Sequence, residues 1–232
     1  MKKIGIIGGL GPEATADYYK RIVDFFHEHN RSLSSPEIII YSVDMTELFK
    51  FVADKHWEPL VEWLTSKLVA LKNAGADFAA ISANTPHIVF DQVQEKSPLP
   101  LISIVEATLA SAKSIGLGKV GLLGTKFTMQ SNFFGARFAK EGIVVVVPND
   151  HEQQYIHDKL VSEIELGIFN ESTRQELLAI ISRMRERDNI DAVILGCTEL
   201  PLILNDGMSK ISFLNTTAIH VAAICKHCMC PV

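Results

Sequence analysis

The sequence is poor in the features that mark secreted, membrane-bound and nucleic-acid-binding proteins. Its 232 residues include four cysteines, three of which fall within the last eight residues, and this spacing builds no disulfide framework. Acidic and basic residues are interspersed at a net charge of −5, without the basic patch that binds nucleic acid or an anionic membrane. We therefore expect a cytoplasmic protein whose partners include neither nucleic acid nor a membrane.

Long apolar runs are also missing. The first apolar run, in MKKIGIIGGLGPEAT, is broken by glycines and Pro12 after a few residues. It is far too short for a signal peptide or a membrane span, and we interpret it as a first β-strand. At 232 residues, the chain is long enough for one large α/β domain or two small ones, each with a core of its own.

Short apolar runs that predict β-strands alternate with amphipathic stretches that predict helices. This alternation is typical of a mainly parallel, doubly wound α/β protein. The expected strands cover 4–7, 38–43, 77–81, 99–104, 119–123, 143–147, 192–195 and 210–214. A polar stretch follows Asp44, and we expect the next helix at 59–73. Because the runs at 77–81 and 192–195 share one pattern of preceding helix and following hydroxyl residues, we expect two pseudo-duplicated lobes.

The glycine-rich turn after the first strand suggests an anion site. Segment 9–14, GLGPEA, formally satisfies the dinucleotide fingerprint G-x-G-x-x-A. The next strand, however, ends at Asp44, about thirty residues beyond the glycines instead of about twenty. We therefore expect Gly9 and its neighbours to bring backbone amides close to a small anion such as a carboxylate.

The segment DAVILGCTELP, residues 191–201, carries the strongest chemical signal. Four apolar residues lead through Gly196 to Cys197, so we expect the thiol at the carboxyl edge of a parallel sheet, where α/β proteins bind ligands. Backbone N–H groups and the start of a following helix would lower the pKa of this thiol and make it a base or a nucleophile. The alternative is that Cys197 is a small buried apolar residue.

Neutral hydrogen-bonding side chains follow the other expected strands. They are Asn84, Thr85, Thr125, Thr128 and Thr198, with Thr216 and His220 as further candidates. The chain has no phosphate-binding loop, and the gaps in its Cys/His tract at 225–230 are too tight for a typical zinc site, so we predict no metal. Such a set suits a small zwitterion or dicarboxylate, and it favours proton abstraction beside a carboxylate.

Five motifs lie in order along the chain. They are IGIIGGLGPEAT near the start, SANTPH at 82–87, LGTKFTM at 123–129, GCTEL at 196–200 and NTTAIH at 215–220. Together they resemble the aspartate/glutamate racemase superfamily, and most of all its aspartate racemase branch. The resemblance implies two pseudo-symmetric α/β lobes, which we place at 1–106 with 214–232 and at 107–213, with the active site in the cleft between them. It also implies a homodimer that racemises acidic amino acids without pyridoxal phosphate, metal or another cofactor.

The resemblance further implies roles for individual residues. Members of the family place two cysteines on opposite faces of the substrate's α-carbon, and Cys197 corresponds to the second of them. Asn84, Thr85 and Thr198 would hold the α-amino and α-carboxyl groups. Further candidates for contact with the substrate are Gly9, Thr125 and Thr128.

The chain departs from the family pattern at the first cysteine. Ala83 stands in its place, and a methyl group cannot exchange a proton, so the symmetric two-thiol mechanism is unavailable. Ser82 is expected on the opposite side of the pleat. His87 lies about one turn into the following helix and is a candidate for the second acid/base, because an imidazole suits that chemistry. A structural histidine is the alternative.

A second departure concerns the substrate's side chain. Aspartate-specific members tend to carry a lysine where Glu165 aligns. A carboxylate that faces the pocket would repel the side chain of aspartate by about 1 kcal/mol or more. An exposed Glu165 would have no such effect.

These observations predict a cofactor-independent amino-acid racemase. Cys197 would exchange the α-proton on one face, and water or a neighbouring hydroxyl would serve the other. One alternative is a one-cysteine lyase such as a malonate-type decarboxylase, in which the thiol only protonates a planar intermediate. The other is an amino-acid-binding protein that has lost turnover together with its first thiol.

Overall fold

The computed structural model describes residues 1–31, 33–205 and 207–230. The chain forms two compact units. The first unit comprises Met1–Ile104 together with the C-terminal segment from Thr217, and the second comprises Val105–Thr216. Among the described helices, none is long and apolar enough to cross a membrane.

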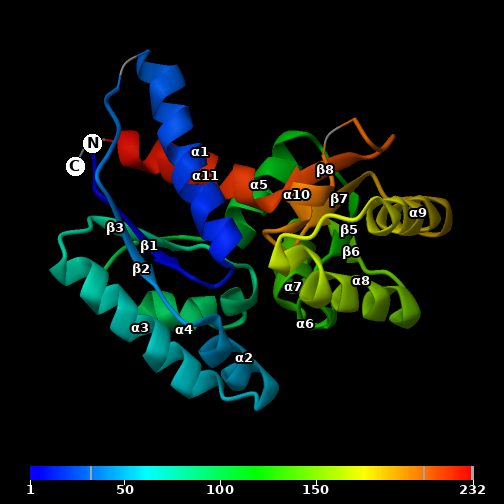
Figure 1. Cartoon of the computed structure of the whole chain (residues 1–232), viewed down its shortest axis with the longest axis horizontal. Helices are drawn as coiled ribbons and strands as arrows, with labels where there is room; N and C mark the ends of the chain where they lie inside the picture. Colours follow the sequence, from blue (N-terminus) through cyan, green and yellow to red (C-terminus); the bar gives the residue numbers. More distant parts are fainter. Residues whose placement is uncertain (32, 206, 231–232) are drawn as a thin grey trace. The chain divides into compact units, whose positions relative to one another are not determined.

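The first unit is built on a four-stranded parallel sheet with the order β2-β1-β3-β4 (Figure 1). Its strands are β1 (Ile4–Gly8), β2 (Ile38–Ser42), β3 (Phe78–Ile81) and β4 (Leu101–Ile102). Its helices are α1 (Pro12–Asn30), α2 (Met45–Ala53), α3 (Trp57–Asn73), the 3₁₀-helix η1 (Thr85–Val89), α4 (Phe90–Lys96) and α11 (Thr216–Met229).

Alternate residues of β1 face opposite sides of this sheet, as the pleat requires. Ile6 belongs to a buried cluster with Tyr18 of α1 and Ile224 of α11. Ile7 belongs to a second cluster that includes Leu64 of α3. Helices therefore cover both faces of the sheet, which explains why its central strand is apolar along its whole length.

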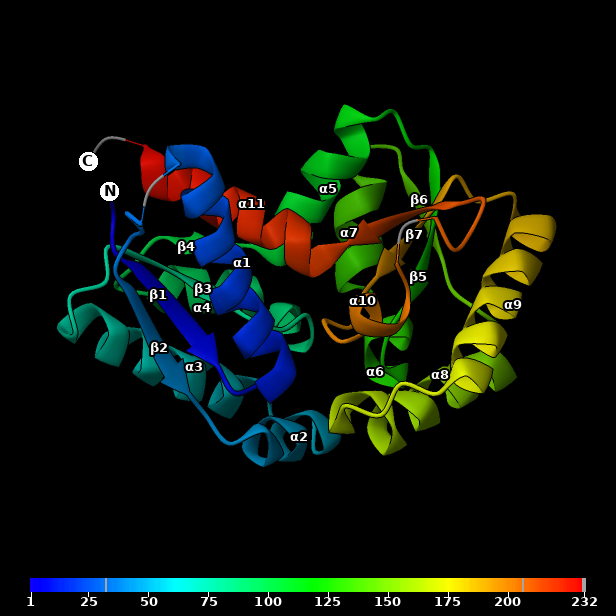
Figure 2. The ribbon, with the colours of Figure 1, turned by 45° about the horizontal axis from the view of Figure 1, so that its top comes forward.

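The second unit repeats this plan with the strand order β6-β5-β7-β8, again all parallel (Figure 2). Its strands are β5 (Lys119–Leu123), β6 (Val144–Val146), β7 (Ala192–Leu195) and β8 (Ser212–Asn215). Its helices are α5 (Ile104–Ser114), α6 (Lys126–Gln130), α7 (Phe133–Ala139), α8 (Asp150–Ser162), the 3₁₀-helix η2 (Ile164–Leu166), α9 (Glu171–Asp188) and α10 (Leu200–Ile203).

The two sheets share one topology. Adding four to each strand number of the first sheet gives the order of the second. This repetition confirms the predicted α/β fold of two similar parallel-sheet lobes. The expected placement of the active site in a cleft between the lobes stays a prediction.

The expectation that the first helix after Asp44 lies at 59–73 was wrong. Helix α2 occupies Met45–Ala53, and Asp44 caps it by accepting a hydrogen bond from the Thr46 N–H at 2.9 Å. Leu48 is buried in this helix and joins the core that α3 forms. Asp before an amphipathic segment is a recognised helix start, so the sequence did contain the signal.

Candidate functional site

Cys197 lies at the carboxyl edge of the second sheet. Its strand β7 is central, and Leu195 aligns with Leu123 of β5 on one side and Asn215 of β8 on the other. Gly196 follows, and its N–H donates to the Leu123 carbonyl at 2.6 Å. A Cβ on Gly196 would lie 2.6 Å from Leu122 Cδ1 and 2.9 Å from that carbonyl oxygen. Only glycine therefore fits between strand and thiol.

Cys197 and its two successors form one hydrogen-bonded group. The Cys197 thiol donates to Oε2 of Glu199 at 3.0 Å, and the Thr198 hydroxyl donates to the same oxygen, also at 3.0 Å. Cys197 is 7% exposed and Glu199 3% exposed. The sequence analysis identified Cys197 and Thr198 but missed Glu199. The sequence feature that could have identified Glu199 is the position of a carboxylate two residues after the thiol.

The predicted lowering of the Cys197 pKa was wrong. Burial, the negative charges of Glu199 and Glu165, and the hydrogen bond donated to Glu199 together raise the pKa of this thiol well above its usual range. The expected helix dipole is also weak, because α10 has only four residues and starts at Leu200. At neutral pH, the resting site holds a protonated thiol.

A second carboxylate, Glu165, interacts electrostatically with Cys197 and Glu199. It lies in η2 and is partly buried. Burial, followed by repulsion from Glu199, raises the pKa of Glu165 to about 7. Because Glu165 is partly buried, it is not the freely exposed carboxylate that would have no effect on a substrate.

Thr125 and Thr128 lie at the end of the neighbouring strand β5. Thr125 caps α6 by accepting a hydrogen bond from the Thr128 N–H at 3.3 Å, and the two hydroxyl oxygens lie 3.1 Å apart. A Cβ on Gly196 would lie 3.4 Å from Thr128 Cγ2. The second unit thus brings Thr128, Gly196 and Cys197 together at one sheet edge.

In the first unit, the Gly9 N–H of the glycine turn already donates its hydrogen bond to a side chain. Gly9 has a φ of +78°, and a Cβ there would lie 2.2 Å from the Val43 carbonyl oxygen. Its N–H donates to Thr15 Oγ1 at 2.9 Å, and this hydroxyl donates to the Gly11 carbonyl at 3.0 Å. The expectation that the Gly9 amide would contact an anion was therefore wrong, because Thr15 takes its hydrogen bond.

The segment that resembles the first cysteine motif follows β3. Ala83 and Asn84 are buried, and Thr85 begins η1. Ser82 is fully buried and donates to the Ile7 carbonyl at 3.1 Å. Ala83 and Asn84 thus lie at the carboxyl edge of their own sheet, which is the place that the motif predicted.

His87 has a structural position. Its Nδ1 lies 3.0 Å from the Ala83 carbonyl, and its Nε2 accepts a hydrogen bond from the Ile104 N–H at 3.3 Å. Since a carbonyl can only accept, Nδ1 carries the proton. Burial, then the neighbouring His220, lowers the pKa of His87 to about 3. The structure therefore contradicts the use of His87 as the second acid/base, because both ring nitrogens are engaged and the ring is neutral.

The two further candidates at the last strand are also engaged. The Thr216 hydroxyl donates to the Leu195 carbonyl at 2.8 Å. His220 lies 2.8 Å from both the Tyr18 hydroxyl and the Ile102 carbonyl oxygen. Burial lowers the pKa of His220 to about 4. The Thr216 hydroxyl thus links the start of α11 to β7, and the His220 ring links α11 to α1 and β4.

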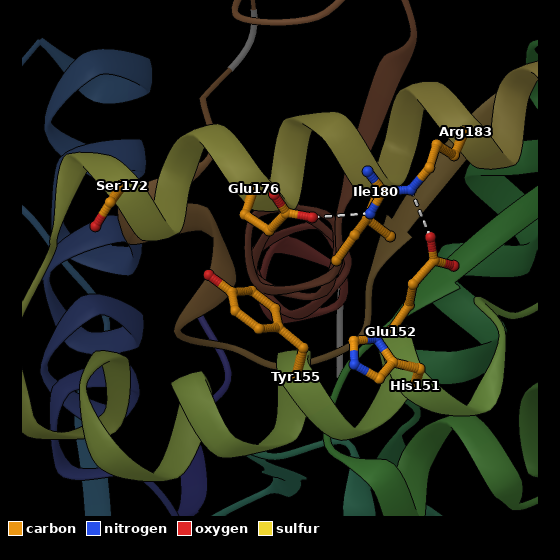
Figure 3. Close-up of a pocket in the computed structure, with 7 residues that line it drawn as sticks. All are labelled: His151, Glu152, Tyr155, Ser172, Glu176, Ile180 and Arg183. Atoms are coloured by element: carbon orange, nitrogen blue, oxygen red, sulfur yellow. Dashed lines mark hydrogen bonds and ion pairs between the residues drawn. The ribbon is translucent and has the colours of Figure 1, made fainter.

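A cavity of about 350 Å³ lies between α8 and α9, apart from these residues (Figure 3). Its lining residues are His151, Glu152, Tyr155, Ser172, Glu176, Ile180 and Arg183. Arg183 donates to Glu152 at 2.7 Å and to Glu176 at 2.8 Å, so its charge is neutralised. None of the predicted site residues lines this cavity. Within the part of the chain that the structure describes, no group of three His, Cys, Asp or Glu side chains gathers to hold a metal ion.

Comparison with known proteins points to one family, both by sequence and by fold. The chain is 25% identical over 220 residues to the "Broad specificity amino-acid racemase RacX" of Bacillus subtilis (strain 168), covering 93% of each chain. A solved aspartate racemase homologue from Pyrococcus horikoshii OT3 is 37% identical, with a TM-score of 0.87 over 98% of this chain and 99% of that one. The aspartate racemase of Picrophilus torridus, at 22% identity and a TM-score of 0.79, covers 98% of this chain and 94% of its own, and shows the fold alone.

The family model described as "Asp/Glu/Hydantoin racemase" matches residues 7–224. This range includes Ala83, Cys197 and both sheets except the first three residues of β1. The resemblance drawn from the five motifs is therefore confirmed. The chain belongs to the Asp/Glu/hydantoin racemase family.

Proposed function

We propose that this protein is a cofactor-independent amino-acid racemase in which Cys197 exchanges the α-proton of the substrate. The observation that carries the proposal is the position of Cys197. Its thiol lies at the carboxyl edge of a parallel sheet. The residue before it is Gly196, which no other residue can replace without a steric clash, and the chain belongs to a racemase family. A thiol is well suited to take a proton from carbon once it is ionised.

With Ala83 at the other position, the two faces of the α-carbon would be served by different groups. Cys197 acts on one face, and water or a neighbouring hydroxyl delivers a proton to the other. Asn84, Thr85 and Thr198 hold the α-amino and α-carboxyl groups in this scheme. We further propose that the protein works as a homodimer in the cytoplasm. Sedimentation of the purified protein measures its molecular mass and so tests whether it is a dimer.

The experiment that tests the proposal is α-proton exchange in D₂O. Purified protein is incubated with single L- and D-amino acids, including aspartate, glutamate and neutral and basic ones. Mass spectrometry follows deuterium at the α-carbon, and optical rotation follows racemisation. We expect deuterium uptake and loss of rotation with at least one amino acid. Absence of both with every amino acid would contradict the proposal.

The single thiol also fits a second candidate, a malonate-type decarboxylase, because such a lyase needs a proton donor on one face only. The same protein is therefore tested for carbon dioxide release from aryl- and alkylmalonates. Release without α-proton exchange would favour the lyase. Thermal stabilisation by an amino acid, without either reaction, would indicate a binding protein.

A further inference from the structure

Glu199 has no role in the proposed function, although it lies beside the proposed acid/base. Its Oε2 accepts hydrogen bonds from the Cys197 thiol and from the Thr198 hydroxyl, both at 3.0 Å, and the residue is 3% exposed. Burial of a carboxylate is costly unless such hydrogen bonds satisfy it. The two donors fix Oε2 against the sulfur, with the thiol proton directed at it.

The thiol needs such an acceptor. Only a thiolate is basic enough to take a proton from carbon. Burial and the charges of Glu199 and Glu165, however, raise the pKa of the Cys197 thiol well above its usual range, so the proton rests on sulfur. Before Cys197 can act as a base, this proton has to leave. The oxygen that already accepts its hydrogen bond is Oε2 of Glu199.

Glu165 increases the tendency of Glu199 to take the proton. The two carboxylates repel each other, which contributes to the raised pKa of Glu165. Such repulsion is relieved when either carboxylate becomes protonated. A proton that moves from Cys197 to Glu199 therefore relieves the repulsion between the two carboxylates, while the thiolate that it leaves behind is itself repelled by Glu165.

We propose that Glu199 accepts the thiol proton of Cys197 during turnover, which makes it a positioning residue that acts through Cys197. The inference rests on the proposed function. The S–H bond breaks as an O–H bond forms on Oε2, leaving a thiolate and a neutral carboxyl group. The thiolate takes the α-proton, and water protonates the opposite face of the carbanion. The resulting hydroxide removes the proton from Glu199 and restores the resting state.

Glu199→Gln separates this role from a purely electrostatic one. Glutamine has nearly the same shape but carries no charge and accepts no proton. Removing the charge lowers the thiol pKa, so alkylation of Cys197 by iodoacetamide at pH 7 to 9 becomes faster. If Glu199 only repelled the thiolate, α-proton exchange would also become faster. We expect instead that exchange falls by about a hundredfold, within the range of general acid–base catalysis.

Alkylation is followed by mass spectrometry on the peptide that carries Cys197, because Cys230 is exposed and also reacts. The matched control is Glu176→Gln, which removes a carboxylate from the surface of α9 and is expected to leave both rates unchanged. Glu199→Asp keeps the charge but withdraws it from the sulfur by one methylene. Its exchange rate is expected between those of Glu199→Gln and the wild type.

The outcomes separate the inference from the proposed function. If the wild type exchanges the α-proton and a folded Glu199→Gln variant exchanges it at the same rate or faster, the inference is overturned while the proposed function stands. No exchange in the wild type contradicts the proposed function, and the inference falls with it. If Glu199→Gln does not fold, Glu199→Asp decides: a several-fold loss supports the inference, and a rate equal to the wild type overturns it. A wild-type thiol that titrates below pH 8 also overturns it.

Discussion

The Tyr18 hydroxyl donates a hydrogen bond to Nδ1 of His220 across 2.8 Å, because the other ring nitrogen of His220 donates to the Ile102 carbonyl. The imidazole of His220 is therefore neutral and fixed in one tautomer. Its ring centroid lies 6.4 Å from that of His87, a second buried neutral imidazole. The first unit thus contains two histidines whose protonation opposes folding.

This pair predicts that acid destabilises the first unit. The pKa of His87 is lowered to about 3 and that of His220 to about 4 from an ordinary 6.5. Between pH 6.5 and about 3, the unfolded chain binds more protons than the folded one, so stability falls as the pH falls. The loss should reach a few kcal/mol. Both tryptophans, Trp57 and Trp63, lie in this unit, so urea unfolding followed by tryptophan fluorescence at pH 7 and pH 5 measures it.

His220→Gln keeps polar groups at the site but removes one of the two titrations, so it should reduce this pH dependence to the part that His87 contributes. His151→Gln, on the surface of α8, is the control and should leave it unchanged. Equal unfolding free energies of the wild type at both pH values would refute the account of the two buried imidazoles.

Gly9 and Gly116 offer a matched test of the glycine turn. Both have positive φ values, +78° and +72°, but a Cβ on Gly9 would collide with Val43 whereas one on Gly116 would meet no atom within 4 Å. Gly116→Ala should therefore lower the free energy of unfolding by about 1 kcal/mol, which is the cost of the positive φ alone. Gly9→Ala should cost clearly more and lower the melting temperature further. Similar melting temperatures for the two variants would show that the turn adapts.

Glu165 predicts a pH-dependent choice of substrate. Because its pKa is raised to about 7, its carboxylate is mostly charged at pH 8 and mostly neutral at pH 6. As the pH falls, acidic amino acids should therefore become better substrates relative to neutral ones. The measurement is the kcat/KM of an acidic amino acid divided by that of a neutral one. Glu165→Gln should raise this ratio at pH 8 and remove its pH dependence. A wild-type ratio that is the same at both pH values would place Glu165 outside the substrate's surroundings.

Much of the fold could be predicted from the sequence, because parallel strands buried on both faces are apolar throughout and are separated by amphipathic helices. The family motifs also identified Ala83 and Cys197 as residues at sheet edges. Helix α2 was missed because the stretch after Asp44 was interpreted as polar and the capping residue at its start was overlooked.

The electrostatics of the site could not be predicted. The pKa of Cys197 depends on Glu165, which is distant in sequence, and on the direction of the Glu199 side chain, which the turn after β7 sets. Likewise, the motif showed a glycine at position 9 but not that Thr15 folds back onto its amide. Side-chain direction and tertiary neighbours decide these properties, and neither has a periodic signal in sequence.

The comparison of Cys197→Ala with Cys230→Ala in D₂O tests the central claim most directly. Both variants lose one thiol, but Cys230 is exposed near the end of α11 and has no role in the proposed chemistry. The account predicts that Cys197→Ala loses deuterium uptake at the α-carbon while Cys230→Ala retains the wild-type rate. Deuterium uptake by a folded Cys197→Ala variant at the wild-type rate would contradict it.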